Sequence, residues 1–440
     1  VVGRFVGKQA LAAVGGTTST LINLLVGFFV GLSSGATVVI SQFYGARKPD
    51  KVHWAVHTAV AFSLIGGVLF MIIGVVFAHM ALSAMHTPED VLTYAVVYIR
   101  IYFLGMIPNL IYNMGAGILR AVGDSKRPLY FLIGSCMVNI LLDLILVAGL
   151  RLGVAGAAIA TVISQMASCA FVLLSLRSHK MPVRLGWGGF QASVIRRIVT
   201  FGFSPFLILA SDSILLIVLN TVLQKYGGPG EGDTLVTCAT IVQSYLLLIT
   251  MPMGGITLGS QPVVSFNYGK GDPDRIKKAI QCITGLCVIF CIFMTIVTQT
   301  ISPLYVRLFT TDSVILARSV TYIKRFTAMI IPLAIQYPLV DETTALGKVG
   351  QALFCSAFRK CVFFTGLLLL PALFTADAAF FSEPIADVIS ATNDKRSVPP
   401  SISADPEGMS EPTFIIDISQ SKKERSSAVS ICYIIVPLLS

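Results

Sequence analysis

The chain has 440 residues, of which 55% are hydrophobic and only 12% are charged. One water-soluble core of ordinary size cannot bury that much apolar surface, so the composition excludes a typical soluble domain. The formal net charge of +10 would be compatible with nucleic acid, but the Lys and Arg residues form no basic tract with interleaved aromatic residues. We therefore expect a lipid bilayer, and no nucleic acid, as the surroundings of this chain.

Apolar stretches long enough to cross the roughly 30 Å hydrocarbon layer as helices recur along the chain. We expect ten spans, at residues 10–43, 53–80, 91–119, 128–150, 154–177, 200–224, 233–266, 279–305, 315–345 and 350–375. Most basic residues between the spans lie in alternate connections, such as Arg47, Lys48 and Lys51, and these connections are expected on the cytoplasmic side. The sequence thus predicts an all-α multi-pass protein of the plasma membrane, in a bacterium the inner membrane.

The nine cysteines lie in apolar runs or, for Cys432, in the tail, and none of them forms a CxxC pair. His57 and the other histidines have no HExxH or other ligand spacing. We therefore expect no disulfide, no zinc site and no cofactor. The chain opens without a basic segment followed by an apolar core and a cleavage site, so we predict no signal peptide.

One segment of the first half returns 224 residues later. Residues 31–51, GLSSGATVVISQFYGARKPDK, align with residues 255–275, GITLGSQPVVSFNYGKGDPDR. Shared hydrophobicity cannot explain the common Tyr-Gly and Pro-Asp pairs. When the second copy is shifted by two further residues, IATVIS at 159–164 also matches IADVIS at 385–390. We predict two six-helix bundles in the same orientation, related by a pseudo-two-fold axis along the membrane normal.

The two copies differ at their ends. The span at 200–224 would map before Val1, so we expect the first helix of a twelve-helix fold to be missing. IADVIS runs into the polar sequence ATNDKRSVPPSISADPEGMSEP, which predicts that the twelfth helix stops halfway. The expected domains are an N-terminal lobe (1–178, helices 2–6), a cytoplasmic linker (179–199), a C-terminal lobe (200–391, helices 7–11 and part of 12) and an atypical polar tail (392–440).

Glycines at intervals of four residues precede the repeated segment and continue into it. Gly27, Gly31 and Gly35 form GxxxGxxxG, and Gly255 and Gly259 are the counterpart in the second copy. Small residues at this spacing let helix backbones approach closely, so we predict that these glycines pack against other helices.

Ionisable groups inside spans cost about 2.5 to 3.5 kcal/mol on insertion scales, so each is a candidate functional group. Asn139 and Asp143 in MVNILLDLILV are four residues apart and share one helical face. Their oxygens would hold a proton or a sodium ion, and Thr161 on the next helix would add a hydroxyl oxygen. An interhelical hydrogen-bond network without an ion is the alternative.

Further candidates lie in the second half. Asp212 is in the middle of ILASDSILLIVLN, and Asp341 follows two prolines in IPLAIQYPLVDETTALG. Proline weakens the backbone hydrogen bonds of a helix, and broken helices in transporters line binding cavities. We therefore predict Asp341, Asp212 and Gln336 as cavity residues of the C-terminal lobe. For Asp212 the alternative is a carboxylate bonded to a neighbouring hydroxyl.

Ordered motifs in both halves resemble one transporter family. They are VGRFVGKQALAAVG, GLSSGATVVISQFYGA, GILRAVGDSKRP, NILLD and GVAGAAIATVIS, followed by GSQPVVSFNYGKGD, QYPLVDETTALG and FRK. Together, from Val1 to about Ala391, they resemble the multidrug and toxic compound extrusion (MATE) family of the oligosaccharide-flippase superfamily. The resemblance implies export of organic cations and other drug-like molecules in exchange for sodium ions or protons.

The resemblance also implies roles for particular residues. Asn139, Asp143 and Thr161 would belong to the cation site of the N-terminal lobe, and Asp341 would be the acidic residue of the C-terminal lobe. The family's aspartate on the first helix would lie before Val1, so the implied site is incomplete in this chain. We expect a monomeric antiporter that works by alternating access and is not an enzyme.

Three other functions remain open. A lipid-linked glycan flippase would need several inward Arg or Lys residues for pyrophosphate, and only Arg100 and Lys324 are obvious candidates. A membrane-embedded transferase would need a metal-binding acid pair such as DxxD, which the sequence lacks. The differences at both ends would also fit a degenerate, inactive copy.

Overall fold

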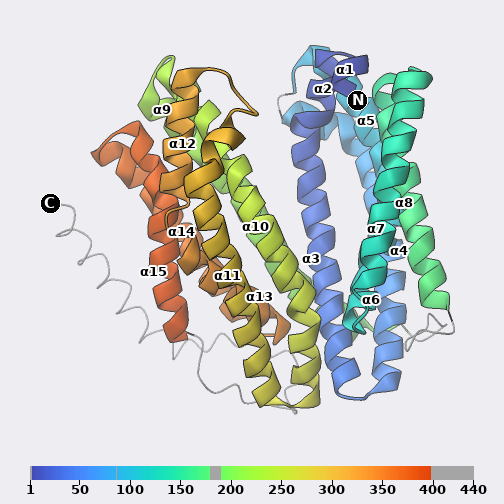
Figure 1. The fold of residues 1–440 in the computed structure, drawn as a ribbon. Coiled ribbons are helices and arrows are strands. Elements are labelled where there is room, and N and C mark those ends of the chain that lie inside the picture. Colours follow the sequence, from blue (N-terminus) through green and yellow to red (C-terminus); the bar gives the residue numbers. More distant parts are fainter. Residues whose placement is uncertain (1, 86, 179–189, 398–440) are drawn as a thin grey trace. The chain divides into compact units, whose positions relative to one another are not determined.

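The computed structural model describes residues 2–85, 87–178 and 190–397, and every regular element in these ranges is a helix (Figure 1). The first helix group consists of α1 (Val2–Phe5), α2 (Lys8–Gly15), α3 (Thr17–Gly45), α4 (Pro49–Ala84), α5 (Glu89–Leu104), α6 (Met106–Ala121), α7 (Lys126–Asp143), a π-helical segment (Leu144–Gly149) and α8 (Gly153–Arg177). The second group consists of α9 (Ala192–Gly227), α10 (Glu231–Lys270), α11 (Pro273–Val306), α12 (Ser313–Phe326), α13 (Ile330–Ala345), α14 (Val349–Leu373), a 3-10 helix (Ala376–Phe381) and α15 (Ser382–Ser397).

Within the described residues, eight helices are long and apolar enough to cross a membrane, and α5 with α6 makes a ninth if the pair is one span. This agrees with the predicted all-α polytopic fold. The expected span at 91–119 is this pair, bent by 51°. The expected span at 315–345 is two helices, α12 and α13, which do not qualify as a candidate span. Both expected spans therefore contain a break in the helix that the expected ranges did not locate.

Proline explains where these two spans break. Pro108 and Pro332 each occupy the first turn of the helix that follows the break, in α6 and α13. Proline has no backbone N–H and is tolerated in the first turn of a helix, whereas further inside it removes a hydrogen bond. Each break therefore falls just before its proline.

Three predicted boundaries also change. The expected span at 10–43 contains an interruption at Gly16, between α2 and α3. The helix α9 already begins at Ala192, so the last part of the expected linker is helical, while 179–189 lie outside the described residues. The helix α15 continues to Ser397, past the predicted stop at Ala391. The residues after Ala391 are polar in sequence, which does not by itself end a helix.

The helix boundaries keep the 224-residue interval of the sequence repeat. The starts of α4 and α11 are separated by this interval, and so are both ends of α6 and α13. Equivalent hydrogen bonds accompany them: Ser41 Oγ donates to the carbonyl oxygen of Ala121 at 3.2 Å, and Ser265 Oγ donates to that of Ala345 at 3.0 Å. The pseudo-two-fold arrangement of the two bundles itself stays a prediction.

The two helix groups meet mainly where α3 contacts α9 and α10. A Cβ atom built on Gly35 would overlap the carbonyl oxygen of Ile198 and the backbone of Gly202, both in α9. Gly31 approaches Gly202 equally closely, so the predicted packing role holds for the glycines of α3. A Cβ on Gly255 or Gly259 would meet no atom within 4 Å, so the packing role is wrong for the counterpart glycines in this conformation.

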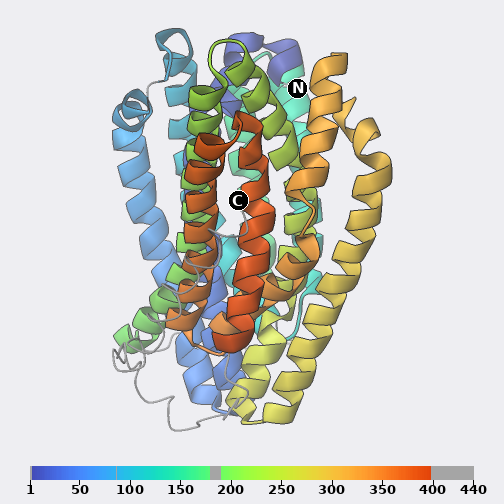
Figure 2. The ribbon, with the colours of Figure 1, turned by 90° about the vertical axis from the view of Figure 1, so that its left-hand side faces the viewer.

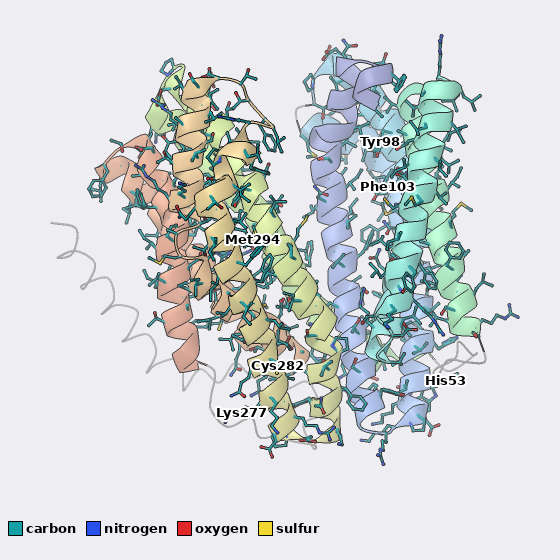
Figure 3. The ribbon with its side chains drawn as sticks, viewed as in Figure 1. His53, Tyr98, Phe103, Lys277, Cys282 and Met294 are labelled. Atoms are coloured by element: carbon teal, nitrogen blue, oxygen red, sulfur yellow. The ribbon has the colours of Figure 1, made fainter. Side chains whose placement is uncertain are left out.

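We call the end of the helix groups that carries the α3–α4 and α10–α11 turns the basic end, because Arg47, Lys48 and Lys270 lie there (Figure 1). Here a glycine of each helix lies against the backbone of the other. Gly45 of α3 lies against the carbonyl oxygen of Phe266, and Gly269 of α10 lies against that of Gln42. Figure 3 labels His53 and Lys277 toward this same end. The groups are therefore closed against each other at the end that the positive-inside rule assigns to the cytoplasm.

Candidate functional site

The first candidate site lies at the end of α7. Asn139 and Asp143 stand one turn apart on this helix, and the π-helical segment Leu144–Gly149 follows Asp143 directly. Segments of π-helix are rare and often occur at functional sites, because the wider turn interrupts the regular hydrogen-bond pattern. The backbone thus changes its helical form immediately after the predicted coupling carboxylate.

Two polar atoms of this site have no hydrogen-bond partner within the described part of the chain. They are Nδ2 of Asn139 and Oδ1 of Asp143, and both atoms are buried. Buried side-chain polar atoms in proteins are almost always paired, so such atoms need an explanation. A carboxylate oxygen beside an amide is a suitable acceptor for a proton or a ligand for a sodium ion, which fits the predicted chemistry.

Tyr98 joins this site from α5, near the end of the first helix group opposite to the basic end (Figure 3). Its side chain lies close to Thr161 of α8 and within electrostatic range of Asp143. Thr161 Oγ1 donates to the carbonyl oxygen of Ala157 at 3.0 Å, which leaves its lone pairs free to accept. The structure therefore brings Thr161 and Asp143 together around Tyr98, which the sequence reasoning missed. The available signal was a tyrosine inside an apolar span, since a buried phenol requires a polar partner.

In the second helix group the predicted residues separate into different environments. Asp341 of α13 is partly buried, and its Oδ2 accepts a hydrogen bond from Thr257 Oγ1 of α10 at 2.5 Å. Gln336 is 2% exposed, and its Oε1 accepts from Ser390 Oγ of α15 at 3.3 Å. In this conformation Gln336 therefore joins α13 to α15 in the packed interior, and its role as a cavity residue stays a prediction.

Asp212 of α9 forms an ion pair with Lys360 of α14, at 2.7 Å between Oδ1 and Nζ. The alternative of a neighbouring hydroxyl partner is therefore wrong, because the partner is an ammonium group. Tyr337 of α13 lies within electrostatic range of both Asp212 and Asp341. The two predicted acids thus flank one tyrosine without forming a contact that joins them directly.

A second ion-pair cluster lies beside the first, where α14 and α15 run side by side (Figure 2). Arg359 Nη1 contacts Glu383 Oε1 at 2.7 Å and Asp387 Oδ1 at 3.1 Å. The sequence analysis included Arg359, Lys360 and Asp387 in the motifs FRK and IADVIS but did not name them as candidate site residues, although all three lie in apolar stretches. Asp143 was chosen because a charge inside a span is costly. The same reason applies to these three residues.

Glu342 is a further buried acid that the sequence analysis did not name. It follows Asp341 directly, is 1% exposed, and neither of its carboxylate oxygens has a hydrogen-bond partner within residues 2–397 as described. Across those same residues, no three His, Cys, Asp or Glu side chains come together as a set that could hold a metal ion.

The described helices are long and apolar enough to cross a lipid bilayer, which defines this chain as a polytopic α-helical membrane protein. Residues 1–145 and 209–367 match the model of the MatE family, and the chain belongs to this family. The spans and the family together indicate a multi-pass protein of the plasma membrane.

Two relatives with multidrug names are similar to the chain over different lengths. It is 30% identical over 290 residues to the probable multidrug resistance protein YoeA of Bacillus subtilis, a match that covers 64% of this chain and 61% of that relative. It is 23% identical over 377 residues to the multidrug export protein MepA of Staphylococcus haemolyticus, covering 85% of this chain and 82% of the relative. The match with YoeA thus spans less than two thirds of that protein.

Solved structures agree on the fold. A crystal structure of MATE in complex with MaL6 superposes with a TM-score of 0.83, at 21% identity and 89% coverage of both chains. An outward-facing multidrug resistance MATE family transporter of the MOP superfamily also gives 0.83, at 21% identity, covering 89% of this chain and 88% of the other.

Proposed function

We propose that this chain is a cation-coupled antiporter that exports organic cations or drug-like compounds by alternating access. Three facts support the proposal: membership of the MatE family, the multidrug names of the relatives YoeA and MepA, and the charges within the spans. The observation that carries it is the Asp143 site, where buried polar atoms without partners lie beside Tyr98 and Thr161. The antiporter would be monomeric, would need no cofactor and would catalyse no covalent reaction.

The coupling step is neutralisation of Asp143. A carboxylate with one oxygen buried and without a partner is costly, so a sodium ion or a proton arriving from outside removes that cost. Because a π-helical segment follows Asp143 directly, a change of charge there can alter how the end of α7 packs on α8. The repacked state then binds the cationic substrate less well, and the substrate leaves to the outside.

Alternating access requires the basic end to open. The hydrogen bond from Ser34 Oγ to Gln261 Oε1, at 2.8 Å, and that from Gln42 Nε2 to the carbonyl oxygen of Ala345, at 3.2 Å, join α3 to the second helix group. Both bonds must break for substrate to enter from the cytoplasm. These two bonds contribute about 1 kcal/mol each, and a bound ion or substrate must shift them together with the packing of α3 on α9 and α10.

A lipid-linked glycan flippase is the second candidate, and the charges favour it less. The cations inside the spans of the second helix group include Arg359 and Lys360, but carboxylates already neutralise both. A pyrophosphate group needs cations that are free to bind it. We therefore rank the exporter above the flippase. An inactive copy is the third candidate, and the transport test decides it.

The test is ethidium efflux from proteoliposomes with an imposed sodium or proton gradient. Asp143→Asn keeps the size and polarity of the side chain but removes its charge, and we expect it to abolish gradient-driven efflux. The matched control is Asp90→Asn, which changes an exposed aspartate of α5 in the same helix group and should leave efflux unchanged. Gradient-driven efflux that survives in Asp143→Asn would contradict the assignment, and no efflux by the unsubstituted protein would favour the inactive copy.

A further inference from the structure

The ion pair between Asp212 and Lys360 is unequally exposed. The side chain of Asp212 is 50% exposed, whereas that of Lys360 is 10% exposed. Charged residues within membrane spans face the interior of the bundle or a water-filled cavity rather than lipid. The carboxylate is thus accessible to a solute, while its present partner reaches it from inside the helix group.

Asp212 lies where α9 leaves the first helix group. Along α9, the contacts with glycines of α3 run from Ile198 near the basic end through Gly202 to Leu209, whose Cδ1 lies 3.3 Å from a Cβ built on Gly27. Asp212 is three residues after Leu209 and therefore stands one turn further along nearly the same side of the helix. A solute that enters between the groups from the end opposite to the basic end would meet Asp212 where the contact between the groups begins.

Lys360 has a second partner that does not depend on Asp212. Its ammonium group also donates a hydrogen bond to the carbonyl oxygen of Ile208, one turn before Asp212 on α9. Its neighbour Arg359 is held by Glu383 and Asp387, so those two acids already have a cationic partner. Lys360 can therefore give up Asp212 and keep a hydrogen bond at the same place.

We propose that Lys360 is an internal cation that competes with cationic substrates for Asp212. In the substrate-free state Lys360 neutralises Asp212, and an organic cation takes its place by pairing with the exposed face of the carboxylate. The cation pairs with the carboxylate as Lys360 leaves it, so no bare carboxylate arises during the exchange. The displaced ammonium group keeps the carbonyl of Ile208 but loses its counter-charge, and this cost is why Lys360 limits the affinity. This inference rests on the proposed function, because it assigns Asp212 as the substrate's anchor and Lys360 as the residue that limits affinity.

The test is ethidium binding to the purified protein in lipid nanodiscs, followed by fluorescence. In Lys360→Met the competitor is gone, and we expect the dissociation constant to fall about tenfold, equivalent to about 1.4 kcal/mol. In Lys360→Arg the planar guanidinium holds the carboxylate more firmly, and we expect weaker binding. Lys360→Arg also keeps the charge inside the spans, so it carries the test if Lys360→Met does not fold.

Two controls separate competition from a structural role. Asp212→Asn should weaken binding, and adding Lys360→Met to Asp212→Asn should restore nothing, because the competition requires the carboxylate. Lys324→Met on α12 removes one positive charge from the same helix group and should leave ethidium binding unchanged.

Three results would overturn the inference. The first is that Lys360→Met binds ethidium no more tightly than the unsubstituted protein at unchanged melting temperature. The second is that Lys360→Met tightens binding equally in the Asp212→Asn background, and the third is that Lys360→Arg binds as tightly as Lys360→Met. If the unsubstituted protein binds no ethidium at all, the proposed function itself fails. In the three results above, the protein still binds ethidium and only the competition by Lys360 is contradicted.

Discussion

At the scale of single residues, Arg359 of α14 pairs with two carboxylates at once. It contacts Glu383, whose side chain is 8% exposed, and Asp387, whose side chain is 1% exposed. A buried ion pair of this kind adds little stability compared with apolar residues of the same size, but loss of one partner leaves uncompensated charge. The cost of a substitution therefore depends on which member is removed.

We predict that Arg359→Ala lowers the free energy of unfolding by about 3 to 5 kcal/mol, because two acids lose their cation in a medium that solvates them poorly. The measurement is a denaturant titration in detergent micelles, supported by the melting temperature. The control is Arg318→Ala, which breaks an exposed pair with Glu231 and should cost about 0 to 1 kcal/mol. Equal losses in the two variants would show that the Arg359 cluster is not buried in the way described.

The sequence indicated which aspartates within the spans are candidate functional residues, but it could not indicate their partners. Asp143, Asp212 and Asp341 stand out because each interrupts an apolar run. The partner of Asp212 is Lys360, 148 positions later, and only the packing of α9 on α14 brings the two together. For the same reason the sequence could not show that Gln336 is buried against Ser390.

At the scale of helices, length and hydropathy predicted most spans because a helix must be long and apolar to cross the hydrocarbon layer. Hydropathy cannot detect a bend, since the residues on both sides of it are equally apolar. Pro108 and Pro332 were the available signals for the breaks before α6 and α13. The two breaks lie at equivalent positions of the repeat, because α6 and α13 begin 224 residues apart.

The contact of α3 with α9 provides a prediction with a matched control. In Gly35→Ala the added Cβ would overlap the backbone of Ile198 and Gly202, and backbone cannot move aside as a flexible side chain can. We expect a loss of about 1 to 3 kcal/mol in stability, together with slower efflux. In Gly259→Ala, at the equivalent place in the repeat, the Cβ meets nothing within 4 Å, and stability should change by less than about 0.5 kcal/mol.

The same pair of variants can be followed by cross-linking. Cysteines introduced at Ser34 and Gln261 stand where a 2.8 Å hydrogen bond joins the side chains of α3 and α10, so a short bifunctional thiol reagent should link them. Gly35→Ala should reduce the yield of this cross-link and Gly259→Ala should not. An unchanged yield in Gly35→Ala would mean that the close approach of α3 and α9 does not hold the groups together.

At the scale of the whole described region, the two helix groups touch along α3, α9 and α10 and are closed at the basic end. The candidate coupling site around Asp143 and the candidate substrate anchor at Asp212 lie in different helix groups. An ion bound in one group can therefore affect substrate in the other only through a change in how the groups pack. The arrangement of the two helix groups therefore favours coupled exchange of ion and substrate over independent binding of either species.

The most direct test of that claim is a counterflow measurement in sealed proteoliposomes without an imposed membrane potential. Ethidium added on one side should drive sodium ions or protons across the membrane in the opposite direction, and Asp143→Asn should abolish this ion movement. Ethidium transport that moves neither ion, or ion movement that persists unchanged in Asp143→Asn, would contradict a coupled exchange through Asp143.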